Sequence, residues 1–76
     1  MIIVRTDDAI YTGGEAFYLE KMEYADEYTV VFAGEEAVDI TKPKALEEAK
    51  KVLDWIADQM KAQQLLSHIV IDMREY

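Results

Sequence analysis

Residues 44–64, KALEEAKKVLDWIADQMKAQQ, form the stretch of sequence that decides the fold. Apolar side chains recur in it every three or four residues, which is the spacing of one face of an α-helix, and charged side chains fill most of the intervening positions. The residues of the apolar stripe are Leu46, Ala49, Val52, Leu53, Ile56 and Met60. We therefore predict one long amphipathic helix from Lys44 to about Gln64, with Thr41 as its N-cap.

The segments on both sides of this helix are typical of β-strands, because they are rich in β-branched and aromatic residues and are separated by glycine or acidic turns. The expected strands cover residues 2–6, 15–24, 28–33, 38–41 and 68–74, and residues 10–12 fit a short return segment that continues the first strand. Residues 15–24 also fit one or two helical turns, and we favour the strand. In the last segment Ile69, Ile71 and Met73 lie at alternate positions, which predicts one buried and one mostly exposed face.

These elements predict an α+β domain in which an antiparallel sheet of four to five strands packs one face against a single helix, in the order β-β-β-β-α-β. A chain of 76 residues makes one domain, and it buries only about 60% of the surface that its unfolded form exposes. It has no cysteine, so no disulfide can stabilise it. A small domain of this kind gains stability from self-association, and we expect a homo-oligomer.

The charge of the chain is unevenly distributed along the sequence. Residues 1–40 contain ten acidic residues against Arg5 and Lys21, whereas residues 41–76 contain six acidic and six basic residues. All of the net charge of −8 therefore lies in the strand-rich first half. An excess of acid repels phosphate backbones and anionic lipid headgroups, so we expect neither direct nucleic-acid binding nor membrane binding.

The start of the chain also bears on its location. The N-terminal apolar run is short and is followed by Asp7 and Asp8, which is unlike a signal peptide. No segment approaches the roughly 20 apolar residues that cross a bilayer. We therefore expect a cytoplasmic protein.

The residues that carry most enzyme chemistry are scarce. Ser67 and His68 are adjacent, and adjacent strand residues point to opposite faces, so they do not pair as nucleophile and base. Gly13 and Gly14 are followed by Glu15 and lack the lysine of a phosphate-binding loop, and the acidic residues lack the spacing of a calcium loop. We predict a non-enzymatic protein and assign no catalytic, cofactor-binding or metal-binding residue. Carboxylate or tyrosine chemistry in a pocket is a third alternative.

A second apolar strip on the predicted helix suggests where the protein self-associates. Trp55 lies beside the main stripe, and Met60, Leu65 and Leu66 continue the strip toward the end of the helix. Trp55 also fits a position at the margin of the core, which is the more common role of such a residue. Exposed apolar strips mark contact surfaces. Our leading hypothesis is a protein-interaction or assembly module that self-associates.

The alternative hypothesis is an acidic inhibitor or decoy. Its charge would imitate phosphate and bind a basic nucleic-acid-binding protein surface, with an affinity that falls as salt is added. The residues of this acidic partner face are Glu20, Glu23, Asp26, Glu27, Glu35, Glu36 and Asp39. Ordinary solubility accounts for the same acidic residues, so the first hypothesis is preferred.

Two segments carry a resemblance to a known type of protein. They are the opening IIVRTDD of residues 2–8 and the helical stretch LEEAKKVLDWI of residues 46–56. The chain resembles short uncharacterised proteins of low-GC Gram-positive bacteria and their prophages, in which strands precede a helix with an EEAKxxL sequence. The resemblance implies this order of strands and helix, and it implies no activity.

Overall fold

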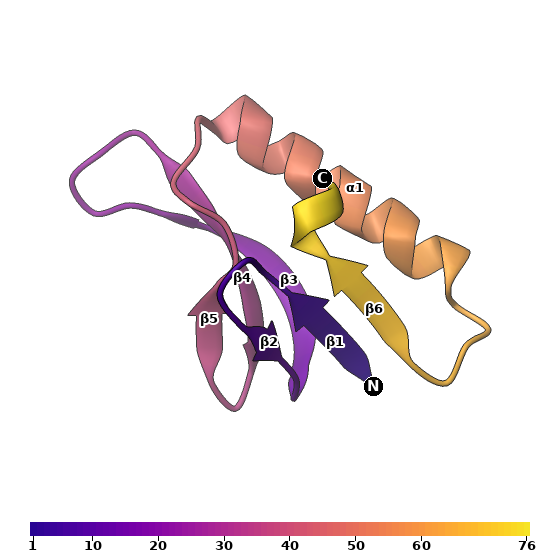
Figure 1. Ribbon diagram of the computed structural model, residues 1–76. Helices are drawn as coiled ribbons and strands as arrows, with labels where there is room; N and C mark the ends of the chain where they lie inside the picture. Colours follow the sequence, from indigo (N-terminus) through magenta and orange to yellow (C-terminus); the bar gives the residue numbers. More distant parts are fainter.

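The protein folds into six strands, one α-helix and a short C-terminal 3₁₀-helix, and the structure, a computed structural model, describes all residues 1–76 (Figure 1). In chain order the elements are β1 (Ile2–Arg5), β2 (Ile10–Tyr11), β3 (Gly14–Lys21), β4 (Tyr28–Gly34), β5 (Ala37–Asp39), α1 (Leu46–Ala62), β6 (Ile69–Asp72) and η1 (Met73–Glu75). The α+β class and the single long helix of the prediction are confirmed. Five strands precede the helix, one more than in the predicted order.

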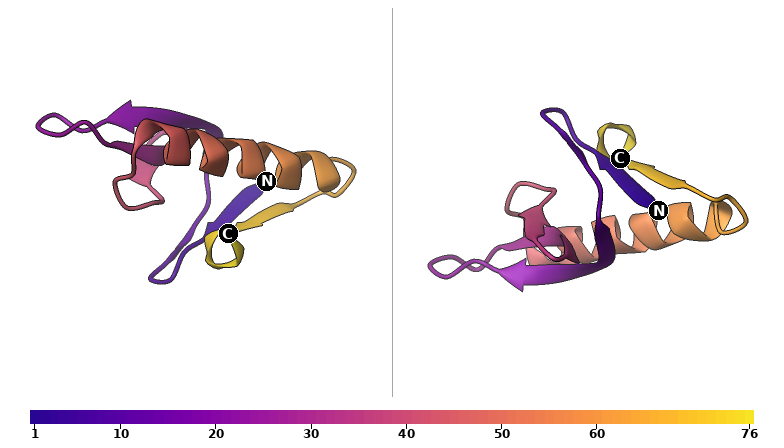
Figure 2. Two further views of the ribbon diagram at one scale, coloured as in Figure 1. Left: turned by 90° about the horizontal axis from the view of Figure 1, so that it is seen from above. Right: turned by 90° about the horizontal axis from the view of Figure 1, so that it is seen from below.

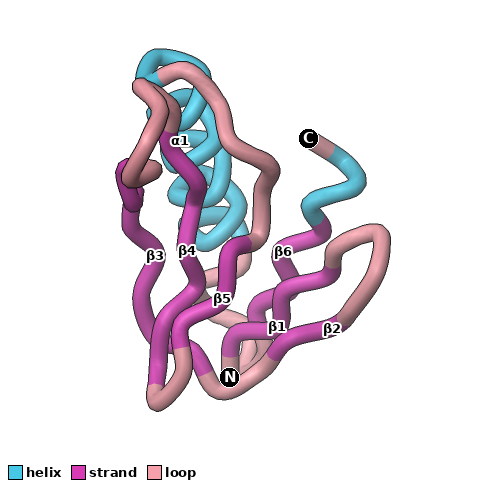
Figure 3. Tube along the Cα trace, turned by 90° about the vertical axis from the view of Figure 1, so that its left-hand side faces the viewer, coloured by secondary structure: helices cyan, strands magenta, loops and turns pink.

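The strands form two small sheets instead of the single antiparallel sheet that the sequence predicted. Sheet A has the order β2-β1-β6 and sheet B has the order β3-β4-β5; Figure 3 shows both. The break follows β2, where Gly13 has a φ of 87° and turns the chain out of sheet A. β1 and β6 run parallel, because the chain passes through sheet B and α1 before it returns to sheet A.

β3 and β4 form the longest antiparallel pair. Phe17 lies opposite Phe32, and Leu19 lies opposite Val30. The two phenyl rings stack with their centroids 4.9 Å apart. Phe17 and Leu19 are two residues apart and both pack against the core, which is the spacing of a strand. The strand that the sequence favoured here over helical turns is therefore confirmed.

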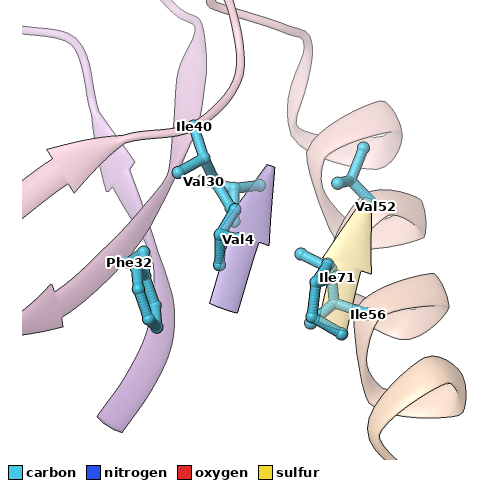
Figure 4. Packing of buried hydrophobic residues seen from close by; sticks show 7 residues of the cluster. All are labelled: Val4, Val30, Phe32, Ile40, Val52, Ile56 and Ile71. Carbon is cyan, nitrogen blue, oxygen red and sulfur yellow. The ribbon is translucent and has the colours of Figure 1, made fainter. Parts of the chain in front are cut away.

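The hydrophobic core lies between the two sheets and the helix. Its buried cluster consists of Val4, Val30, Phe32, Ile40, Val52, Ile56 and Ile71 (Figure 4). The helix contacts β3, β4 and β6, and in Figure 2 it runs between β3 on one side and β6 on the other. The predicted helical stripe is confirmed for Ala49, Val52 and Ile56, which are buried, whereas Leu46 and Leu53 are half-buried and lie outside the core cluster. Only 10 of 76 residues are buried, so the core is small.

Both ends of α1 differ from the prediction. The helix starts at Leu46, because Lys44 still pairs with β4 through backbone hydrogen bonds of 2.7 and 2.8 Å. Thr41 does not cap it, since its Oγ1 accepts a hydrogen bond from the backbone N–H of Val30 at 3.1 Å. The helix ends at Ala62, two residues earlier than predicted. No helix of the structure combines the length and apolar composition needed to span a bilayer.

The predicted terminal strand is confirmed over part of its length. Ile69 and Ile71 pack toward the core, but the strand ends at Asp72, and Met73 starts η1. The side chain of Asp72 accepts a hydrogen bond from the backbone N–H of Arg74 at 3.1 Å. This local side-chain bond favours the 3₁₀ turn over the extended chain, so the strand stops there.

Candidate functional site

The outer face of sheet A is apolar and uncovered. In the parallel pairing of β1 with β6, Ile3 lies opposite Val70, and neither belongs to the buried core. Ile10 of β2 lies opposite Arg5, which is two residues from Ile3 and therefore on the same face. Ile10 is 58% exposed and Val70 is 46% exposed. The face thus presents Ile10 and Val70 to solvent, with the half-buried Ile3 of β1 beside Val70.

Two charged residues lie side by side at one end of this face, Arg5 and Asp72. Asp72 accepts hydrogen bonds of 2.9 and 2.7 Å from the guanidinium of Arg74, and this pairing lowers the pKa of Asp72 to about 2. Arg5 forms no ion pair, and its buried Nε has no hydrogen-bond partner. The chain therefore leaves this one buried donor unsatisfied.

The free edge of β6 is sealed by a side chain. The amide of Gln63, the residue that follows α1, donates to the C=O of Val70 and accepts from its N–H, both at 2.9 Å. These bonds occupy the backbone groups of Val70 in the middle of the edge, with which a further strand would pair. Sheet A is therefore closed at its β6 edge, while its outer face is open.

The predicted self-association residues do not form one strip. Trp55 and Met60 are half-buried and pack against the core, and the Trp55 ring meets Tyr76 edge-on with the centroids 5.4 Å apart. Leu65 and Leu66 lie beyond the end of α1, in the loop before β6, and are 95% and 61% exposed. The helix stops too early to carry these two leucines, so only the loop pair is free to contact a partner.

The seven residues of the predicted acidic face lie mainly in two groups on sheet B. One group surrounds the connection from β3 to β4 and consists of Glu20, Glu23, Asp26 and Glu27. The other forms the turn from β4 to β5 and consists of Glu35 and Glu36. The length of β4 separates the groups by about 20 Å. Asp39 lies in β5, where its Oδ1 accepts a hydrogen bond of 3.2 Å from the Thr29 hydroxyl. Negative charge thus gathers at both ends of sheet B.

A cleft of about 450 Å³ opens next to the C-terminus, between residues of the two sheets. Its volume is within the range of small-molecule pockets. Its charged residues balance one another and are Asp7, Asp8, Asp39, Lys42, Lys44 and Arg74. The hydroxyls of Thr6 and Thr41 in the cleft are both bonded to backbone groups. The cleft therefore presents no threonine hydroxyl that is hydrogen bonded to a base.

Ser67 and His68 lie in the loop before β6, outside this cleft. The backbone C=O of Ser67 accepts a hydrogen bond of 3.2 Å from the N-terminal amine of Met1, and no hydrogen bond joins the side chains of Ser67 and His68. No group of three or more histidine or carboxylate side chains is placed to hold a metal ion. Ser67 and His68 therefore do not form a hydrogen-bonded nucleophile–base pair in this structure.

In comparisons with known proteins, no family model, curated protein or solved structure matches this chain. The resemblance carried by residues 2–8 and 46–56 therefore stays a prediction.

The sequence does contain a signal for the outer face of sheet A, and this signal lies in the strands rather than in the helix. Residues 2–4 read Ile-Ile-Val and residues 69–71 read Ile-Val-Ile, so both strands are continuously apolar instead of alternating. Continuous apolar runs are typical of strands that are covered on both faces. Only one face of sheet A is covered within the chain.

Proposed function

We propose that the protein is a non-enzymatic assembly module whose copies associate through the outer face of sheet A. The observation that supports this proposal is the apolar surface formed by the exposed Ile10 and Val70 and the half-buried Ile3. No helix or second sheet packs on this face, since α1 and sheet B lie on the core side. Adjoining apolar side chains exposed in this way mark interaction sites.

The distribution of charge favours a second copy of the chain as the partner. The outer face of sheet A carries one positive and one negative residue, Arg5 and Asp72, whereas acidic residues gather at the ends of sheet B. Two copies joined through sheet A would hold their acidic ends apart, and salt screens charges beyond about 8 Å at physiological ionic strength.

The size of the face sets how far the contact extends. Three short strands cover an area of about 13 by 14 Å. A standard interface buries roughly 800 Å² on each partner, which is more than this sheet alone provides. We therefore expect the contact to extend over the loop before β6, where Leu65 and Leu66 are exposed. The added burial would compensate for the small core of the single chain.

Sedimentation of wild-type protein and two variants over a wide range of concentrations tests this proposal. Ile10→Glu introduces a charge on the outer face of sheet A, and Tyr24→Glu introduces the same charge at a 93% exposed position in the β3–β4 connection. Burying the exposed part of Ile10 in both copies contributes about 2 to 3 kcal/mol, so Ile10→Glu should weaken a dimer roughly 30- to 100-fold or more.

Tyr24→Glu should self-associate like wild type. A wild-type protein that is monomeric at every concentration would contradict the proposal. So would equal weakening by the two substitutions, because the contact would then depend on total charge and not on sheet A.

A further inference from the structure

We infer that the free edge of β3 binds an extended basic segment of another protein by strand addition. β3 pairs with β4 on one side and has no strand on the other. It has eight residues and is the longest strand of the chain. An edge strand presents a row of unpaired N–H and C=O groups, and extended peptides bind such edges through main-chain hydrogen bonds.

The hydrogen bonds of β4 show which groups of β3 point outward. Tyr28 exchanges both backbone bonds with Lys44, and Val30 accepts from Ile40, so these residues of β4 bond away from β3. In an antiparallel ladder the direction alternates from one residue to the next, so every second residue of β3 is bonded to β4. The residues of β3 whose backbone groups point to the free edge are Phe17, Leu19 and Lys21.

Nothing in the chain seals this edge over its middle. Gln63 bonds to the free edge of β6, but no side chain bonds to the outward backbone groups of β3. The features that usually blunt an edge occur only at the two ends of the strand, as a bulge between Gly14 and Ala16 and a charge at Lys21. Residues 16–19 carry no charge. The middle of β3 is therefore open to pairing.

The charges at the two ends of β3 select the occupant. Glu15, Glu35 and Glu36 line a groove of about 830 Å³ at the start of the strand, and the acidic group of the β3–β4 connection lies at its end. A second copy paired edge to edge would bring acidic groups against each other, and like charges across strands are destabilising. A segment with an uncharged middle and lysine or arginine at both ends, about 17 Å apart, matches both ends instead.

This inference does not depend on self-association through sheet A, because β3 belongs to the other sheet. The monomeric Ile10→Glu variant should bind a basic segment as well as wild type does. A failure of the sheet A contact therefore leaves the inference about β3 intact.

Amide hydrogen exchange of the full chain with the synthetic peptide KKVTVTVKK tests the inference. On addition of the peptide, the amides of Phe17 and Leu19 should gain protection, whereas that of Tyr18 is already bonded to β4 and should change little. The peptides EEVTVTVEE and KKVTPTVKK should not protect Phe17 and Leu19, because one has the wrong charge and the other has a proline within its strand.

Charge substitutions separate a local effect from a general one. Glu35→Lys combined with Glu36→Lys should weaken peptide binding about three- to tenfold. Asp54→Lys combined with Asp58→Lys makes the same change in net charge on the exposed side of α1 and should leave binding nearly unchanged. Equal losses would overturn the inference. The inference would also be overturned if the amides of Phe17 and Leu19 stay unprotected when the peptide is added. Protection of these amides on raising the protein concentration alone would overturn it too, because it would indicate a second copy at this edge.

Discussion

Replacing Gln63 by alanine removes the side chain that seals the free edge of β6. Two hydrogen bonds of 2.9 Å to Val70 are lost. A hydrogen bond of this kind contributes about 0.5–1.5 kcal/mol to stability. Because the backbone groups of Val70 become accessible to water when the side chain is gone, the lower part of this range applies to each bond. We expect the free energy of unfolding to fall by about 1 kcal/mol.

Gln63→Glu provides a graded test of the same contact. A carboxylate can accept from the N–H of Val70 but cannot donate to its C=O, so one of the two bonds is lost and the remaining oxygen repels the carbonyl. We expect the free energy of unfolding of Gln63→Glu to exceed that of Gln63→Ala by no more than the contribution of one hydrogen bond. Urea unfolding can be followed by the fluorescence of Trp55, the single tryptophan, which packs against the core.

Hydrogen exchange at the Val70 amide tests directly whether the Gln63 side chain protects the edge of β6. Its protection should fall in Gln63→Ala and be kept in the control Gln64→Ala, since Gln64 makes no side-chain hydrogen bond. Unchanged protection of Val70 in Gln63→Ala would refute the reasoning, because the edge would then be protected by something other than this side chain.

Two further predictions concern the sheet B turn and the C-terminus. Gly34→Ala should destabilise the fold more than Gly13→Ala, because a Cβ at Gly34 collides with the backbone of Gly13. A Cβ at Gly13 meets open space, and Gly13→Ala costs only about 1–2 kcal/mol for the positive φ of this residue. Thermal unfolding should therefore give a lower midpoint temperature for Gly34→Ala than for Gly13→Ala. The Asp72 carboxylate should stabilise the fold fully above its unfolded pKa of 3.8 and lose this effect as the pH falls toward 2, since Arg74 lowers its folded pKa. A stability difference between wild type and Asp72→Asn that stays constant over this range would contradict the second prediction.

The helix was predictable because its signal is local. The spacing of Ala49, Val52 and Ile56 is contained within two turns, and it determines which side faces the core whatever the strands do. The ends were not predictable in the same way. Whether the helix starts at Lys44 or at Leu46 depends on a backbone pairing between Lys44 and β4, which is distant in sequence.

The division into two sheets could not be predicted from the strands themselves. β1 and β6 lie at opposite ends of the sequence and pair in parallel, which no turn between neighbouring strands specifies. The candidate surface was missed for a related reason. Ile2 and Ile3 are identical side chains, and only the pairing shows that Ile2 packs against the core while Ile3 lies on the outer face.

The most direct test of the central claim is to follow backbone amide chemical shifts as the protein is diluted. If copies meet through the outer face of sheet A, the amides of Ile3, Arg5, Ile10 and Val70 should shift together along one binding curve, while that of Tyr24 in the β3–β4 connection stays fixed. A spectrum that does not change with concentration, or changes confined to sheet B, would contradict the claim.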